Sequence, residues 1–150
     1  MDERSSLGTV SKRGCFFRNA RARNTHVEAT LNHPCVAQVP ANADRVLVVD
    51  PRTSEISYVG EAMPGKQKWY GGVMGANGCI YCIPHMASAV LKIDTRRGAT
   101  TLLEARLPEG LWKWHGGAAN RAGTTVYGFP NNADAVLKIC LLYTSPSPRD

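Results

Sequence analysis

The residues of this chain that could do chemistry are scattered histidines, carboxylates and amides rather than a known catalytic motif. His115 follows Trp114, and because histidine titrates near neutral pH it could act as an acid or a base. Short polar side chains could instead bind a divalent cation through oxygen, or make the local hydrogen bonds that loops favour. Together with His85, the candidates are Asn42, Asp44, Asn131, Asn132 and Asp134. The sequence has no G-x-S-x-G, H-E-x-x-H or phosphate-loop string.

The five cysteines are expected to be reduced thiols in a cytoplasmic protein. Their number is odd, and the N-terminus has no apolar segment typical of a secretory signal. Cys79 and Cys82 form a C-x-x-C string, but they fall in a predicted strand, where residues three apart point to opposite faces. We therefore expect neither a disulfide nor a shared metal between them.

The net charge of +6 is concentrated at one end of the chain. Residues 1–23 carry +4, whereas the remaining 127 residues carry only +2. We interpret residues 1–23 as a basic, flexible arm, and nucleic-acid binding through it as the weakest of three functional hypotheses, because few aromatic residues accompany the charges. No run approaches the roughly 20 apolar residues that a membrane-spanning helix needs, so no membrane span is predicted.

A pattern that returns every 44 to 46 residues organises the chain around these candidates. Val-Leu-Val-Val-Asp at 46–50 returns as Val-Leu-Lys-Ile-Asp at 90–94 and as Val-Leu-Lys-Ile at 136–139. Lys-Trp-Tyr-Gly-Gly at 68–72 returns as Lys-Trp-His-Gly-Gly at 113–117. A period of this length that contains four short strands is typical of a β-propeller blade.

The best-defined unit, residues 68–105, predicts a meander of four antiparallel strands. Asn77-Gly78 between two apolar runs predicts a tight hairpin, and Pro84 ends the second strand. Extended over residues 24–139, the pattern predicts an all-β fold, a partial β-propeller of about two and a half four-stranded blades with no long helix between residues 40 and 139. The apolar residues expected to be buried are Val46, Val48, Ile80, Val90, Leu91, Ile93 and Val136.

The C-terminal residues 140–150 break the pattern. After Ile139 the repeat predicts an aspartate and a polar turn, but Cys-Leu-Leu-Tyr-Thr-Ser-Pro-Ser-Pro-Arg-Asp follows. This tail resembles translated sequencing-adapter sequence. It is expected to be non-native or disordered, so the natural protein would continue into further blades.

Two strings carry a resemblance to known repeats. G-x-x-G-x-I-Y-x-I-P at 75–84 and V-L-x-I-D at 90–94 resemble the broad group of propellers with NHL, gluconolactonase-like and virginiamycin-lyase-like repeats. Lys-Trp-x-Gly-Gly is also similar to repeats of uncharacterised protist proteins. The resemblance implies that the strands with the Gly-Gly pairs are innermost, where glycine lets neighbouring blades crowd together.

The resemblance also implies that one face of the propeller carries the ligand site. On that face it places Asn42, Asp44, Lys68, Trp69, His85, Trp112, Lys113, Trp114, His115, Asn131, Asn132 and Asp134. Tyr70 occupies the repeat position of His115, which favours a packing role for both residues. Trp69 and Trp114 recur in register and are expected to be wedges between blades.

The leading functional hypothesis is a binding or scaffold module, with a protein or small molecule as its ligand and no bound cofactor. The alternative is a lactonase- or lyase-type metal-dependent enzyme whose catalytic residues lie largely in blades outside this chain. Under that alternative, calcium is the cation expected for the full-length protein, because oxygen ligands suit it.

Overall fold

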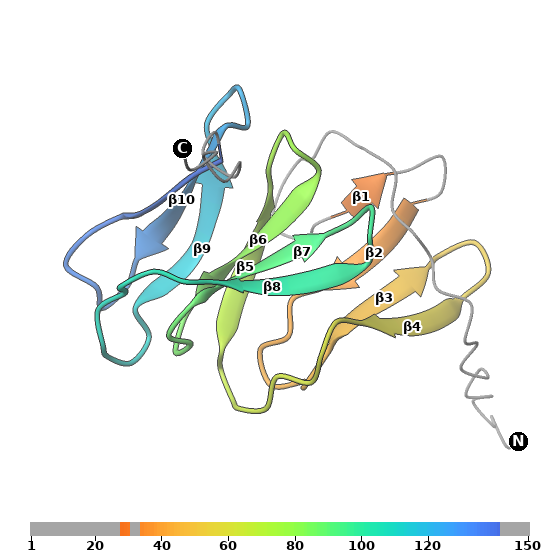
Figure 1. The fold of residues 1–150 in the computed structure, drawn as a ribbon, viewed down its shortest axis with the longest axis horizontal. Coiled ribbons are helices and arrows are strands. Elements are labelled where there is room, and N and C mark those ends of the chain that lie inside the picture. Colours follow the sequence, from red (N-terminus) through yellow and green to blue (C-terminus); the bar gives the residue numbers. More distant parts are fainter. Residues whose placement is uncertain (1–27, 31–33, 142–150) are drawn as a thin grey trace, which may run out of the picture.

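The computed structural model describes residues 28–30 and 34–141, which form eleven strands in three antiparallel sheets (Figure 1). The first sheet contains β1 (Glu28–Thr30), β2 (Pro34–Gln38), β3 (Val46–Asp50) and β4 (Glu55–Val59). The second contains β5 (Trp69–Met74), β6 (Cys79–Pro84), β7 (Val90–Asp94) and β8 (Ala99–Leu103). The third contains β9 (Trp114–Ala119), β10 (Thr125–Pro130) and β11 (Leu137–Cys140). Within these residues the prediction of an all-β fold is confirmed.

Each sheet is a meander in which a strand pairs with the next strand in the chain. Residues 40–139 contain no helix, as predicted, and no helix able to cross a membrane occurs in the part of the chain that the structure describes. The three sheets follow one another in chain order, from orange through green to blue (Figure 1). The first sheet has four strands, although the sequence has Val-Glu at 27–28 where the later units have Gly-Gly.

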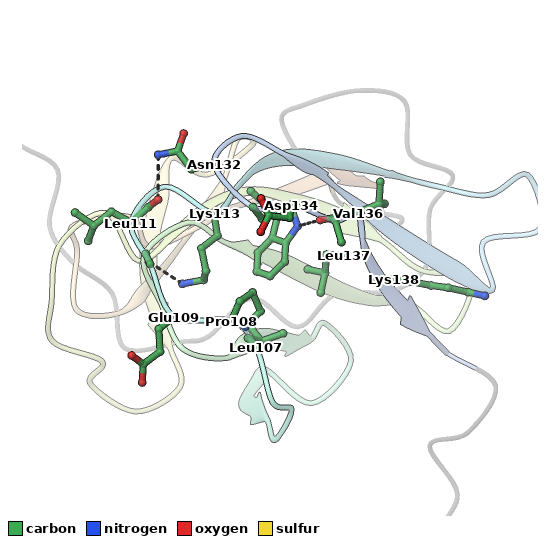
Figure 2. A pocket seen from close by; sticks show the side chains of 14 residues that line it. Leu107, Pro108, Glu109, Leu111, Lys113, Asn132, Asp134, Val136, Leu137 and Lys138 are labelled. Carbon is green, nitrogen blue, oxygen red and sulfur yellow. Dashed lines mark hydrogen bonds between the residues drawn. The ribbon is translucent and has the colours of Figure 1, made fainter.

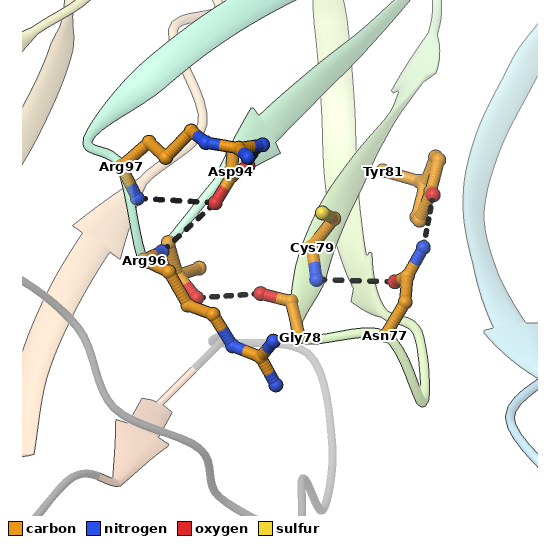
Figure 3. A network of polar contacts seen from close by, with 8 residues as sticks. Asn77, Gly78, Cys79, Tyr81, Asp94, Arg96 and Arg97 are labelled. Carbon is orange, nitrogen blue, oxygen red and sulfur yellow. Dashed lines mark hydrogen bonds and ion pairs between the residues drawn. The ribbon is translucent and has the colours of Figure 1, made fainter. Parts of the chain in front are cut away.

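Turn chemistry at the strand ends explains two features of the repeat. Gly78 has a φ of 77°, which glycine adopts without strain, and the side chain of Asn77 accepts a hydrogen bond from the Cys79 amide (3.2 Å; Figure 3). At the end of β7, Asp94 accepts hydrogen bonds from the amides of Arg96 (3.0 Å) and Arg97 (3.1 Å; Figure 3). The recurring aspartate therefore closes the turn after the third strand of its sheet.

The second strand of the second sheet, β6, is buried on both faces. All six residues of β6 are buried, and they divide by the two-residue period of a strand. Ile80 and Cys82 join a cluster with the first sheet, whereas Tyr81 and Ile83 join a cluster with the third. The unbroken apolar run of β6 therefore suits a strand that the first sheet covers on one face and the third sheet on the other.

The predicted core is confirmed with one exception. Val46, Val48, Ile80, Val90, Leu91 and Ile93 are all buried. Val136 is 54% exposed, so the prediction that it is buried is wrong. It lies just before β11, where no further sheet covers this side among the described residues.

The cysteines differ in part from the expectation. Cys35 is disulfide-bonded, so the prediction of five reduced thiols is wrong. Cys79 and Cys82 are free and belong to the two opposite clusters, as their spacing predicted. Burial raises the pKa of both thiols, which keeps them protonated and unreactive.

The expected boundaries can be compared with the structure only in part. The arm at residues 1–23 and positions 142–150 of the tail lie outside the described residues. Cys140 belongs to β11 and Leu141 is buried, so the third sheet extends one residue past Ile139 and its core extends two.

Candidate functional site

The side chains expected on one ligand face separate into two groups. Lys68, Trp69, His85, Lys113 and Trp114 are buried. The others, His115, Asn131, Asn132 and Asp134, are exposed, as is Trp112. Asn42 and Asp44 are exposed as well. Burial therefore removes five of the twelve expected side chains from contact with a ligand.

The two lysines are held by main-chain carbonyl groups. Lys68 Nζ donates to the oxygens of Ala43 (3.0 Å) and Gly65 (2.9 Å). Lys113 Nζ donates to the oxygens of Ala87 (3.0 Å) and Gly110 (3.4 Å). One acceptor of each pair belongs to the loop before the third strand of the preceding sheet, so each lysine ties its own sheet to the preceding one.

Burial lowers the pKa of both ammonium groups. For Lys68 the nearby carboxylate of Asp44 opposes this effect, whereas Lys113 has only the effect of burial. A buried ammonium group that donates its hydrogen bonds to carbonyl oxygens has a structural role. Neither lysine is positioned as a free base or a ligand-binding charge.

The two tryptophans have an equally local role. Trp69 Nε1 donates to the carbonyl oxygen of Ala89, and Trp114 Nε1 to that of Ala135, each at 2.8 Å. Both acceptors lie in the loop before the third strand of the same sheet. Each indole thus fills the core and satisfies its polar atom inside its own sheet.

A chain of main-chain hydrogen bonds connects the three sheets at this end. The amide of Lys68 donates to Ala41 O (3.0 Å), and the amide of His85 donates to Lys68 O (2.9 Å). The amide of Lys113 donates to His85 O (2.9 Å), and that of Asn131 to Lys113 O (2.8 Å). We call these main-chain hydrogen bonds, together with those from Lys68 Nζ to Ala43 O and from Lys113 Nζ to Ala87 O, the joint between sheets. The Lys-Trp repeat marks the joint in the sequence.

The Gly-Gly pairs allow β5 and β9 to approach closely. A Cβ atom on Gly71 would lie 2.9 Å from the Cα of Gly116, and φ at Gly71 is 84°. Both conditions require glycine. The approach brings the preceding residues, Tyr70 and His115, side by side.

Tyr70, His85 and His115 form a cluster that we call the aromatic cluster. The rings of Tyr70 and His115 stack with centres 4.1 Å apart and planes 27° apart. The His85 ring centre lies 5.5 Å from that of Tyr70 and 5.9 Å from that of His115. His85 is buried and its Nδ1 lies 3.0 Å from Trp114 O, whereas Tyr70 is 49% exposed. Stacking of His115 on Tyr70 agrees with the packing role predicted from their shared repeat position.

A groove lies against the third sheet, with a volume of about 640 Å³ (Figure 2). Its walls are the connection after β8, residues 107–111, and the loop before β11 with the first two residues of that strand, residues 132–138. Trp114 and Leu137 contribute its buried apolar surface. Asn132 binds Leu111 O through its side-chain amide (3.3 Å), so this candidate supports a wall of the groove.

The calcium expectation gains no support from these positions. Among residues 28–30 and 34–141, no three His, Cys, Asp or Glu side chains lie close enough together to hold one metal ion. Sequence reasoning paired Asp134 and Asn132 with the histidines, but these two residues line the groove. It did not identify residues 107–111 as part of a site. Their only indication in the sequence is the pair of apolar residues Leu107 and Leu111 in an otherwise polar connection.

Comparison with known proteins adds no assignment: no protein-family model matches the chain, and no curated protein is significantly similar to it.

Proposed function

We propose that the chain is a binding or scaffold module built as part of a β-propeller, in which each sheet is one blade. The repeated joint supports this architecture, because the same lysine and main-chain hydrogen bonds recur between successive sheets. The observation that carries the function is the use of the Lys-Trp residues. Their polar atoms are satisfied inside the protein. The lysines also reach carbonyl groups of the preceding sheet and so hold successive sheets together.

The binding surface in this proposal is the free edge of β11 with the groove beside it. In the first two sheets, the third strand pairs with a fourth: Val46 faces Val59, and Val90 faces Leu103. In the described part of the third sheet, β11 pairs only with β10. A strand edge with unpaired amide and carbonyl groups is a template for an added strand.

The neighbouring sheet shows what kind of ligand fits. Gly60, at the start of the connection from the first sheet, lies directly against Thr100 of β8. The groove is bounded by the corresponding connection from the second sheet. In this proposal the ligand takes, at the groove, the place that β8 has one unit earlier. The apolar surface of the groove, with Glu109, Asp134 and Lys138 at its rim, suits an extended polypeptide with alternating apolar and polar residues (Figure 2).

A peptide that copies β8 tests this proposal. We expect the peptide Ala-Thr-Thr-Leu-Leu-Glu-Ala-Arg, residues 99–106, to shift the amide NMR signals of residues 137–140 in the ¹⁵N-labelled protein. A control peptide with proline in place of Thr101 and Leu103 lacks two amide donors and should cause smaller shifts. Equal shifts with both peptides, or shifts confined to other strands, would contradict strand addition.

The variant Val136→Asp checks the apolar contribution. Val136 is 54% exposed and lines the groove, so the substitution should leave the fold intact. It places a charge where the peptide would bury an apolar side chain, and we expect weaker peptide binding. Unchanged affinity would remove the groove from the proposed surface.

A further inference from the structure

The aromatic cluster contains two imidazoles from different sheets that converge at one place. His85 follows β6 and is held by the joint, whereas His115 lies on β9 and is exposed. We propose that His85 and His115 together bind one divalent transition-metal ion, of the class that includes Zn²⁺, Ni²⁺ and Cu²⁺. This inference does not depend on the proposed strand addition, which concerns the groove and β11.

The hydrogen bond of His85 prepares its other nitrogen to act as a ligand. Nδ1 lies 3.0 Å from Trp114 O, and because a carbonyl oxygen can only accept, Nδ1 carries the proton. The neutral ring then has its lone pair on Nε2. Metal-binding histidines commonly show this arrangement, since a carbonyl that binds one nitrogen fixes the ring and its tautomer.

The spacing of the two rings suits one shared ion. A metal–nitrogen bond of about 2.0–2.1 Å, with the ring centre roughly 1 Å beyond the nitrogen, puts each ring centre about 3 Å from the ion. Two such rings at a roughly tetrahedral or wider angle are then about 5–6 Å apart. The observed separation of His85 and His115 is 5.9 Å.

The surroundings leave room for further ligands and determine which ions fit. Tyr70 and His115 are exposed, so water can complete the coordination shell. Imidazole nitrogen suits zinc, nickel and copper, whereas calcium takes oxygen ligands. The site is therefore distinct in chemistry from the calcium site that the sequence suggested.

The test is a titration of the whole chain with Ni²⁺ and, separately, with Ca²⁺. We expect Ni²⁺ to broaden the imidazole NMR signals of His85 and His115 together, at one ion per chain, and Ca²⁺ to leave them unchanged. The direct signal of His85 makes a substitution there unnecessary, which matters because its ring is buried against Trp114. Calorimetry gives the affinity for Ni²⁺.

Matched variants identify the ligands. His115→Tyr restores the residue found one repeat earlier and keeps an aromatic ring beside Tyr70, but removes one imidazole; we expect at least about a tenfold loss of affinity. His33→Gln serves as the control and should leave the affinity unchanged.

Three results would overturn the proposal: no Ni²⁺ binding at millimolar concentration, binding that His115→Tyr leaves unchanged, or binding that His33→Gln abolishes. Retained Ni²⁺ binding in Val136→Asp, with the peptide lost, would support the metal site and show that the two proposals are separate.

Discussion

The face of the second sheet that is turned toward the third sheet has the same apolar pattern as the corresponding face of the third sheet. The first of these faces is buried and the second is exposed. Ile83 and Phe129 occupy one repeat position, and Val90 and Val136 another. Ile83 is 0% and Val90 2% exposed because the third sheet covers them, whereas Phe129 is 51% and Val136 54% exposed. The repeat therefore encodes a surface that is suited to being covered, and the neighbouring sheet decides whether it is.

The largest difference between the two faces should come from truncation of the equivalent residues Ile83 and Phe129. Ile83→Ala opens a cavity between sheets and should lower the free energy of unfolding by about 2–5 kcal/mol. Phe129→Ala should change it by less than about 1 kcal/mol, since half of the side chain is already in water. Urea denaturation measures both. Equal losses would show that the third sheet does not cover the second.

The equivalent glycines of β5 and β9 should also differ in how much stability is lost when each is replaced by alanine. Gly71→Ala combines a positive φ with a Cβ that would press on Gly116, and should cost about 2–4 kcal/mol. Gly116→Ala carries only the strain of its φ of 70°, because nothing lies within 4 Å of its Cβ position, and should cost about 1–2 kcal/mol. A larger loss for Gly116→Ala in thermal unfolding would contradict the one-sided contact.

The joint between the two sheets can be tested at Lys113. Lys113→Met removes the donor from Ala87 O and Gly110 O and should cost about 1–3 kcal/mol at neutral pH. The exposed Lys138→Met is the control and should stay within about 0.5 kcal/mol.

The stability difference between the wild type and Lys113→Met should also depend on pH, with a definite sign. Burial lowers the pKa of Lys113 in the folded state, so the unfolded chain binds more protons between the folded pKa and the ordinary lysine value. The wild type should therefore gain stability relative to Lys113→Met as the pH rises through that alkaline range. A difference that shrinks with rising pH would contradict the assignment.

The smallest effect is expected for the tryptophan hydrogen bonds, which lie inside one sheet and should not depend on whether the next sheet covers it. Trp69→Phe and Trp114→Phe each remove one hydrogen bond to a loop of the same sheet and should each cost about 1 kcal/mol. The two losses should be nearly equal in urea denaturation, because both bonds are 2.8 Å long and lie inside a sheet. Clearly unequal losses would mean that one indole depends on the neighbouring sheet.

Most of the fold could be predicted because its signals are local. Asn77-Gly78 predicts a hairpin, Pro84 ends a strand, and the recurring Asp94 closes a turn; each depends on residues close in the sequence. The alternation of Ile80 and Cys82 with Tyr81 and Ile83 follows from the geometry of a strand. These features predicted about two and a half four-stranded meanders without reference to long-range contacts.

The candidate site was only partly predictable. The recurrence of Lys68 and Lys113 marked them as important, but recurrence alone does not distinguish a ligand face from a joint between sheets. That distinction depends on carbonyl groups about 25 residues away, such as Ala43 O and Ala87 O. Likewise, Tyr70 was identified only as the repeat counterpart of His115, and their stacking arises from the approach of β5 to β9.

Periodicity and turn residues thus specify the strands, their turns and the apolar face of each sheet, because these signals act over a few positions. Which of those faces are covered, which lysines are buried, and that His85 and His115 meet follow only from the packing of the sheets. Those outcomes depend on contacts between residues some 25 to 45 positions apart, and the separation of the sheets is fixed where Gly71 meets Gly116.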